Sequence, residues 1–255
     1  MMSIGENHAV IEPRKGRREE NLPPRAILAF TPQDMKLFLR QSPFLHKRPR
    51  QLYLSQVYTG SYQGIELALV GPMIGAPQAV LVLEKLIALG VFQVICMGWC
   101  GSLKPHVAIG DMVLPTGAFS DEGTSTHYPI EEPLPRPAHE LLRPLKAVLA
   151  DESAVVHEGM VWSTDAPFRE TVKKIINYRD AGALAVDMET SALFTVAAFR
   201  HIQLAAALVV SDDLSGLKWV HGFREPKFLK ARQKLVESLL RVLSSEMQEK
   251  QVEQG

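Results

Sequence analysis

The chain has 255 residues, and 28 lysines and arginines balance 28 aspartates and glutamates, so the formal net charge at pH 7 is zero. The hydrophobic fraction of 46% and the charged fraction of 22% are ordinary for a globular protein, and the length is sufficient for one large domain with a sizeable core. This balance gives no indication of a nucleic-acid-binding or membrane-binding protein.

The N-terminal residues 1–24 are polar and charged, and they end in Pro23-Pro24. They lack the apolar core of a signal peptide, and no apolar stretch of the chain is long enough to cross a bilayer without interruption. The sequence therefore predicts a flexible arm over residues 1–24 and a single domain over residues 25–255, in a soluble, cytoplasmic protein.

The first half of this domain alternates between strand-like and helix-like patterns. Thr31-Pro32-Gln33-Asp34 has the residue types of a helix start, and apolar residues at helical spacing between Gly75 and Gly90 predict a second helix. A turn-rich segment of six residues between Tyr58 and Ile65 is typical of a hairpin. The predicted strands are Arg25–Phe30, Gln51–Tyr58, Ile65–Val70, Val91–Met97 and Asp111–Ala118.

The second half continues the same alternation. Helices are predicted at His139–Ala150, Arg169–Tyr178, Glu189–Phe199 and Phe228–Met247, and strands at Val155–Val161, Ala183–Val186 and Gln203–Val210. Apolar strands that alternate with amphipathic helices indicate an α/β protein. We expect a single three-layer domain, in which a mixed, largely parallel and twisted sheet is flanked by helices.

Ligands of such sheets gather at the carboxyl ends of the strands. The segments that follow predicted strands are Thr31–Asp34, Gly71–Gly75, Gly98–Gly101, Ser163–Arg169, Asp187–Glu189 and Ser211–Asp213. They are the candidate positions for chemistry. The two cysteines, Cys96 and Cys100, lack a second ligand pair, so we expect buried, reduced thiols and no metal site.

Two acidic segments stand out at this edge. Asp212 and Asp213 end the most apolar strand, where adjacent carboxylates are costly unless they are solvated, hydrogen-bonded or used as a general acid. The alternative is that Ser211 or Asp212 caps a helix. Glu189 lies at a strand-to-helix junction, where its carboxylate either binds vicinal hydroxyls, such as those of ribose, or simply favours the first helical turn.

Two further segments allow either a binding or a structural interpretation. The glycines of Gly98–Gly101 would let a ligand approach the backbone closely, or they form only a tight turn. Neither a dinucleotide fingerprint nor a phosphate-binding Gly-Lys-Ser/Thr loop is present. Phe168 would stack on a planar ring or belong to the core.

Taken together and in this order, four segments resemble those of the nucleoside phosphorylase family, which includes bacterial-type purine nucleoside phosphorylases, uridine phosphorylases and methylthioadenosine nucleosidases. The segments are Gly71–Gly75, Met97–Leu103 with Ile109–Val113, Val186–Ala192, and Val210–Asp212. The resemblance covers the chain from about Ala26 to the final helix. It implies the fold expected above and cleavage of the N-glycosidic bond of a nucleoside.

The resemblance implies roles for the residues on the sugar and base side. Glu189 would hold the ribose hydroxyls, and Met188 would pack against the sugar. Asp212 would donate a proton or hydrogen bond to N7 of a purine, and Phe168 and Arg169 would help to bind the base. These types suit a reaction that passes through an oxocarbenium-like state, because the enzyme must grip the sugar and draw electrons into the base.

The acceptor side resembles the family less closely. Thr31, Gly98 and Trp99 fall where the family lines the phosphate or water side, but two arginines and a glycine usual there are absent. Phosphate would lose charge-assisted hydrogen bonds without those arginines. Asp34 falls where the nucleosidases place a carboxylate that activates water. Two acceptors therefore stay open: inorganic phosphate as co-substrate, which yields ribose 1-phosphate, or water activated near Asp34.

The resemblance also bears on substrate and assembly. Ser211-Asp212 favours a purine, although the loop Glu122–Tyr128 is more similar to the uridine-cleaving branch, so a uridine phosphorylase is an alternative. A nucleoside-binding protein without turnover is a further alternative. The family implies no cofactor, a small-molecule nucleoside as the ligand, and a homo-oligomer (a dimer, trimer or hexamer).

Overall fold

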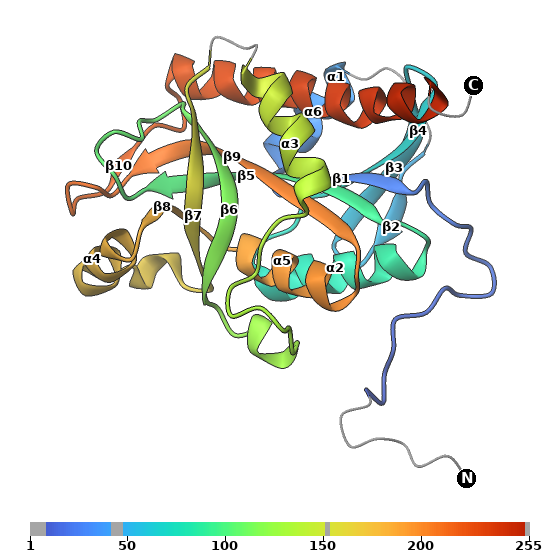
Figure 1. Cartoon of the computed structure of the whole chain (residues 1–255), viewed down its shortest axis with the longest axis horizontal. Helices are drawn as coiled ribbons and strands as arrows, with labels where there is room; N and C mark the ends of the chain where they lie inside the picture. The colour runs from blue at the N-terminus through green and yellow to red at the C-terminus, as the bar shows by residue number, and fades with distance from the viewer. Residues whose placement is uncertain (1–8, 42–47, 151–153, 253–255) are drawn as a thin grey trace.

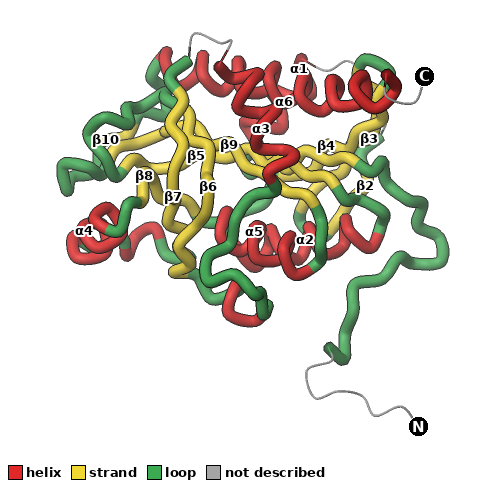
Figure 2. The backbone as a smooth tube through the Cα atoms, viewed as in Figure 1, coloured by secondary structure: helices red, strands yellow, loops and turns green. Residues whose placement is uncertain are grey.

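The computed structural model describes residues 9–41, 48–150 and 154–252, with side chains as far as Ser244. A ten-stranded sheet forms the middle layer between two layers of helices (Figures 1 and 2). The order of its strands is β10-β9-β6-β7-β8-β5-β1-β4-β3-β2. The strands are β1 (Arg25–Ala29), β2 (Arg50–Leu52), β3 (Ser55–Tyr62), β4 (Ile65–Gly71), β5 (Gln93–Ser102), β6 (Met112–Asp121), β7 (Val156–Thr164), β8 (Ala183–Asp187), β9 (Gln203–Asp213) and β10 (Val220–His221).

Helices cover both faces of this sheet, as the alternating pattern predicts. One face carries α1 (Pro32–Gln41), α3 (His139–Ala150) and α6 (Pro226–Val252), and the other carries α2 (Ala76–Ala88) and α5 (Thr190–Phe199) (Figure 1). The remaining helix, α4 (Val172–Asp180), contacts β8. Each face is filled by its own cluster of buried apolar side chains. The expected α/β domain with a mixed sheet is confirmed.

An additional pairing joins β5 and β9, which lie apart in this strand order but run parallel to each other. Their register runs from Gln93 opposite Gln203 to Ser102 opposite Asp213, and it shifts between Cys100 and Gly101. Ser211 is the extra residue of β9 at this shift, since Val210 lies opposite Cys100 while Asp212 lies opposite Gly101. Strand β5 also pairs with β1 in parallel and, near Gly101, with β8 in antiparallel orientation. The ends of these strands therefore meet at one edge of the sheet.

Several predicted boundaries differ from those observed. The predicted six-residue hairpin loop is wrong, because β3 continues to Tyr62 and the turn contains only Gln63 and Gly64. Both turn residues have positive φ angles, 51° and 84°, as the tightest hairpin turns require. Helix α4 begins three residues after the predicted Arg169, because Pro167–Arg169 forms a separate short 3₁₀ turn. Strand β10 was not predicted from its two residues.

The described part of the N-terminal segment, residues 9–24, forms neither helix nor strand but contacts the domain. The backbone of Leu22 donates to the carbonyl of Leu89, and Glu19 pairs with Lys85 of α2 at 2.5 Å. Glu12 pairs with Arg200, at the end of α5, at 3.0 Å. Among the described helices, none combines the length and apolar character that a bilayer span needs.

A buried ion pair ties α6 to α1. Arg232 Nε donates to Asp34 Oδ1 at 2.7 Å, and both side chains are almost completely buried. Burial raises the pKa of Asp34, while the guanidinium of Arg232 opposes that rise. Removal of one member of a buried pair leaves the other charge without compensation, which is costly.

We expect Arg232→Leu to lower the free energy of unfolding by about 3–5 kcal/mol, because Asp34 then stays buried without its partner. Chemical denaturation would measure the loss. The matched control is Arg136→Leu, which removes an exposed ion pair with Glu132 and should cost about 1 kcal/mol or less. Equal losses in the two variants would contradict the role given to the buried pair.

Candidate active site

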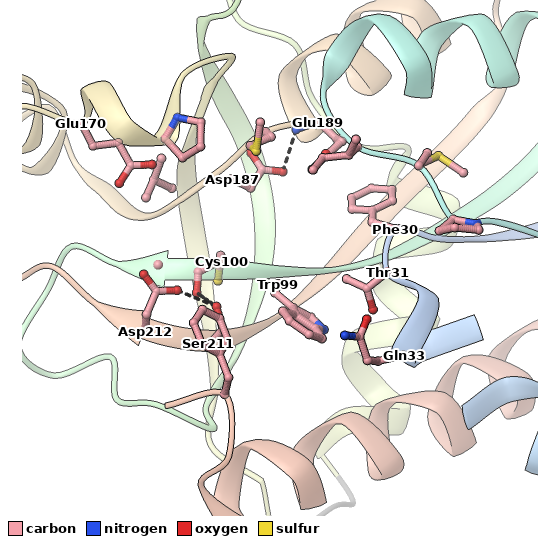
Figure 3. Close-up of a pocket in the computed structure, with 18 of the residues that line it drawn as sticks. Phe30, Thr31, Gln33, Trp99, Cys100, Glu170, Asp187, Glu189, Ser211 and Asp212 are labelled. Atoms are coloured by element: carbon pink, nitrogen blue, oxygen red, sulfur yellow. Dashed lines mark hydrogen bonds between the residues drawn. The ribbon is translucent and has the colours of Figure 1, made fainter. Parts of the chain in front are cut away.

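A cavity of about 920 Å³ opens at the edge where β1, β5, β8 and β9 end (Figure 3). Its walls are mostly apolar and aromatic, and acidic groups lie at separate places within them. Most of the segments that the sequence places after strands converge here. The lining residues used below are Thr31, Gln33, Trp99, Gly101, Phe168, Glu170, Asp187, Met188, Glu189, Asp212 and Trp219.

Glu189 lies at the N-terminal cap position of α5 and is buried in the cavity wall. Its Oε1 accepts a hydrogen bond of 2.6 Å from the backbone N–H of Gly75, which precedes α2. Burial, followed by the nearby carboxylate of Asp187, raises the pKa of Glu189 to about 8. Met188 lines the cavity next to it. The structure thus presents a carboxyl group that hydroxyl donors of a ligand would stabilise in its ionised form.

Asp187 has a structural role that the sequence did not reveal. Its carboxylate accepts hydrogen bonds from the hydroxyls of Ser163 and Thr190 and from the backbone N–H groups of Thr190 and Glu189. Burial raises its pKa, and the hydroxyls of Ser163 and Thr190 oppose that rise. Asp187 therefore fixes the first turn of α5 and the backbone of Glu189, rather than offering a free oxygen to a ligand.

Asp212 lies near the end of β9, on the other side of the cavity from Glu189 (Figure 3). Ser211 Oγ donates to its Oδ1 at 2.6 Å, and Trp219 Nε1 donates to its Oδ2 at 2.9 Å. A Cβ atom on Gly101 would lie 3.0 Å from Oδ2, a tight contact, so the glycine leaves room for the carboxylate in this position. Asp212 belongs to a strand, and the alternative of helix capping is wrong.

The segment before α4 contributes Phe168 and Glu170 to the cavity wall, and Glu170 lies at the same end as Asp212 (Figure 3). Phe168 is 98% exposed, so its ring stands at the rim and is not part of the core. Burial, followed by the negative charge of Asp212, raises the pKa of Glu170 to about 7. Arg169 is exposed and does not line the cavity, so a direct contact with the base gains no support.

The predicted acceptor side is only partly assembled. Thr31 and Trp99 line the cavity, but Asp34 does not. Asp34 is completely buried, and both of its oxygens are engaged, one by Thr31 Oγ1 at 2.7 Å and the other by Arg232. The structure therefore gives no support to Asp34 as a water-activating base, because its carboxylate is a member of the buried ion pair that joins α1 to α6.

Gly98 is also absent from the cavity wall. A Cβ atom at this position would lie 2.4 Å from the ring of Phe30. The glycine is required so that Phe30 can pack against β5, not so that a ligand can approach the backbone. The structure thus gives no support to Gly98 as a residue of the phosphate side, whereas Trp99 next to it lines the cavity.

The charges of the cavity are of one sign. Of the described residues that line it, four are aspartate or glutamate (Glu170, Asp187, Glu189 and Asp212), and none is lysine, arginine or histidine. Within the described residues, no group of three or more potential metal ligands comes together. Cys96 and Cys100 are buried free thiols, as expected, and burial raises the pKa of each well above its ordinary value.

Two residues of this site were missed from the sequence. Glu170 lies within the predicted helix Arg169–Tyr178, and the sequence singled out only its neighbours Phe168 and Arg169 there. Trp219 follows Asp212 by seven residues, in a stretch without a recognisable pattern. Their positions depend on the 3₁₀ turn Pro167–Arg169 and on β10, neither of which was predicted.

Comparisons with known proteins point to one superfamily. The family model described as the phosphorylase superfamily matches residues 24–244. A guanosine phosphorylase from Halorubrum lacusprofundi is 31% identical over 159 residues, which are 62% of this chain and 66% of that protein. A DeoD-type purine nucleoside phosphorylase from Bacillus cereus is 29% identical over 159 residues, or 62% of this chain and 68% of that protein. The matched stretch spans about two thirds of these relatives.

Solved structures share the fold. Uridine phosphorylase from Vibrio fischeri superposes with a TM-score of 0.76 at 24% identity, over 88% of this chain and 93% of that one. Purine nucleoside phosphorylase from Toxoplasma gondii, in complex with immucillin-H, gives 0.77 at 18% identity, over 88% and 91%. At these identities, the likeness establishes the architecture and not the substrate.

The raised pKa of Glu189 predicts a pH-dependent stability. Because the folded state disfavours its ionised form, the contribution of Glu189 to stability falls as pH rises from about its ordinary value of 4.5 towards 8. The glutamine of Glu189→Gln cannot ionise. The melting temperature of this variant minus that of the wild type should therefore increase as pH rises from 5 to 8. For a protein of this size, each kcal/mol of difference in the free energy of unfolding shifts the melting temperature by roughly 2–4 °C.

Thermal denaturation at several pH values would measure this difference. The control is Glu66→Gln, an exposed position on β4 whose curve should run parallel to that of the wild type. If the curve of Glu189→Gln also ran parallel to the wild type, Glu189 would ionise normally in the folded protein.

Proposed function

The chain belongs to the phosphorylase superfamily, and from this premise we propose that it cleaves the N-glycosidic bond of a purine nucleoside, with inorganic phosphate as the acceptor. The observation that supports this most is the placement of Glu189 and Asp212 at separate positions in one apolar cavity. The names of two relatives, a guanosine phosphorylase and a purine nucleoside phosphorylase, favour a purine. The products are the free base and ribose 1-phosphate.

The sugar would bind at Glu189. Its carboxylate accepts hydrogen bonds from the 2′- and 3′-hydroxyls, and Met188 packs against the ring. The backbone N–H of Gly75 and the fixed first turn of α5 hold the glutamate in place. These contacts orient C1′, the reacting atom, relative to the two ends of the cavity. Positioning of reacting atoms is a major contribution to the rate of a reaction.

The base would bind at the Asp212 end. As the C1′–N9 bond breaks, its electron pair moves into the purine, and a proton or hydrogen bond from Asp212 to N7 stabilises the negative charge that develops there. Phe168 and Trp219 are exposed aromatic rings on the cavity wall, and Trp219 contacts Asp212. Planar rings of this kind stack on a base. A phosphate oxygen then bonds to C1′.

Trp219 would have a second role. The indole N–H donates to Oδ2 of Asp212 and the hydroxyl of Ser211 donates to Oδ1, so both oxygens accept hydrogen bonds. N7 of a purine is itself an acceptor, so Asp212 has to carry a proton on Oδ2 to donate to it, and the exposed indole then gives up its hydrogen bond with that oxygen. The hydrogen bond from Trp219 therefore fixes the orientation of the Asp212 carboxyl group before the base binds.

A hydrolytic nucleosidase is the second candidate, and one specific observation favours it. No cationic side chain is found among the described lining residues, and a phosphate dianion would enter a cavity whose charged groups are all acidic. Water needs no such cation. A uridine phosphorylase and a nucleoside-binding protein without turnover are the remaining alternatives.

The sequence-based expectations of a homo-oligomer, of cytoplasmic localisation, and of a flexible arm before a single catalytic domain over residues 25–255 are retained as proposals. No cofactor is required for the chemistry described here. Phosphate would take part as a co-substrate only.

A panel of nucleosides separates the candidates. The protein is incubated with guanosine, inosine, adenosine and uridine, with and without phosphate, and free base is measured by chromatography. We expect base release from the purine nucleosides that depends on phosphate. Equal release without phosphate would identify a nucleosidase, release from uridine alone would overturn the purine assignment, and no release at all would leave a binding protein.

Asp212→Asn tests the acid at the base end. Asparagine keeps the size of the side chain but cannot deliver a proton, so we expect kcat for purine nucleosides to fall by about 10²–10⁴ while the Kd changes little. Steady-state kinetics and equilibrium binding measure the two quantities. The neighbouring Asp213→Asn, whose carboxylate caps Ser215 instead, serves as the control and should retain most of the turnover. Undiminished kcat in Asp212→Asn would refute the assignment.

A further inference from the structure

Glu170 differs from the other carboxyl groups of the cavity. Glu189 is held by the N–H of Gly75, Asp187 by hydroxyls and backbone, and Asp212 by Ser211 and Trp219. Within the part of the chain that the structure describes, no donor reaches the carboxyl group of Glu170. It is thus a partly buried hydrogen-bonding group in the cavity wall that the protein itself leaves available to a ligand.

The position of Glu170 relates it to the base rather than to the sugar. Figure 3 shows Glu170 and Asp212 at the same end of the cavity, away from Phe30 and Thr31. The negative charge of Asp212 also raises the pKa of Glu170, so the two carboxyl groups interact electrostatically at this end of the cavity. A planar base that receives a hydrogen bond from Asp212 would therefore present an adjacent part of its edge to Glu170.

On the edge of a purine, the group next to N7 is the substituent at position 6. In guanine and hypoxanthine this substituent is an oxygen that accepts a hydrogen bond, whereas in adenine it is an amino group that donates one. From this geometry, and resting on the proposed function, we infer that Glu170 is the residue that reads the position-6 substituent of the leaving purine.

The protonation state of Glu170 then selects the base. Burial and Asp212 hold its pKa near 7, so the protonated and ionised forms coexist around neutrality. The protonated carboxyl group donates to the oxygen of a 6-oxopurine, and the ionised form accepts from the amino group of adenine. Asp212 from β9 is the charged group that faces Glu170. Asp187 and Glu189 line the same cavity, and Arg169 beside it points to solvent.

The test compares inosine with adenosine between pH 6 and pH 8. In the wild type, the ratio of kcat/KM for inosine to that for adenosine should fall about tenfold or more over this range, because Glu170 loses its proton. Glu170→Gln offers both a donor and an acceptor but does not titrate, so its ratio should be independent of pH. The control Glu66→Gln, which lies outside the cavity, should follow the wild type.

A second experiment measures binding alone, so that a failure of this inference can be distinguished from a failure of the proposed function. Affinities of the free bases hypoxanthine and adenine are measured by calorimetry at the same pH values, so no turnover is needed. A pH-dependent preference that Glu170→Gln abolishes supports the inference. A preference that is the same in wild type and Glu170→Gln overturns it, even if nucleosides are cleaved. Absence of cleavage with an intact, Glu170-dependent base preference would refute the proposed function alone.

Discussion

The site depends on the parallel pairing of β5 with β9. The ten matched positions bring two segments more than 100 residues apart in the chain to the same edge, and the extra residue Ser211 breaks the alternation just before that edge. A bulge of this kind changes the direction in which the next side chain points. Here it places Asp212 opposite Gly101, which has no Cβ to exclude the carboxylate. The acid and the space that it needs arise from one irregularity.

The second constraint is the cost of carboxyl groups in an apolar cavity. Desolvation disfavours their charged forms, and without a neighbouring cation the protein lowers that cost with hydrogen bonds or leaves the group protonated. Asp187 is stabilised by hydroxyls and N–H groups, and Asp212 by Ser211 and Trp219. Glu189 and Glu170 are compensated less, and their pKa values are about 8 and 7. A ligand that donates hydrogen bonds would therefore stabilise the ionised forms of Glu189 and Glu170 most, because the protein compensates their desolvation least.

A buried cation lies behind the cavity wall at the predicted acceptor side. Arg232 is buried against Asp34, and its guanidinium stacks on the ring of Trp99 at 4.9 Å. Trp99 faces the cavity and the arginine does not. The acceptor side therefore presents Thr31, Gln33 and an indole ring to the ligand, with the positive charge neutralised inside the core. This arrangement is the main physical difference between the site and a typical phosphate-binding loop.

The sequence by itself determined the α/β class, the two helical layers and the edge at which the site lies, because strand and helix periodicities are local and parallel strands end together. It also identified Glu189 and Asp212, which directly follow or end buried strands. Only the tertiary structure decided which neighbouring residues share their cavity. Asp34 does not line the cavity, because Arg232, 198 positions away in the chain, binds its carboxylate. Gly98 does not line it either, because the ring of Phe30 packs on it. Glu170 enters the cavity through the 3₁₀ turn before α4, and Trp219 enters it because β10 folds back on the end of β9. Neither element follows from a local pattern, since a short turn and a two-residue strand are stabilised by the tertiary contacts around them.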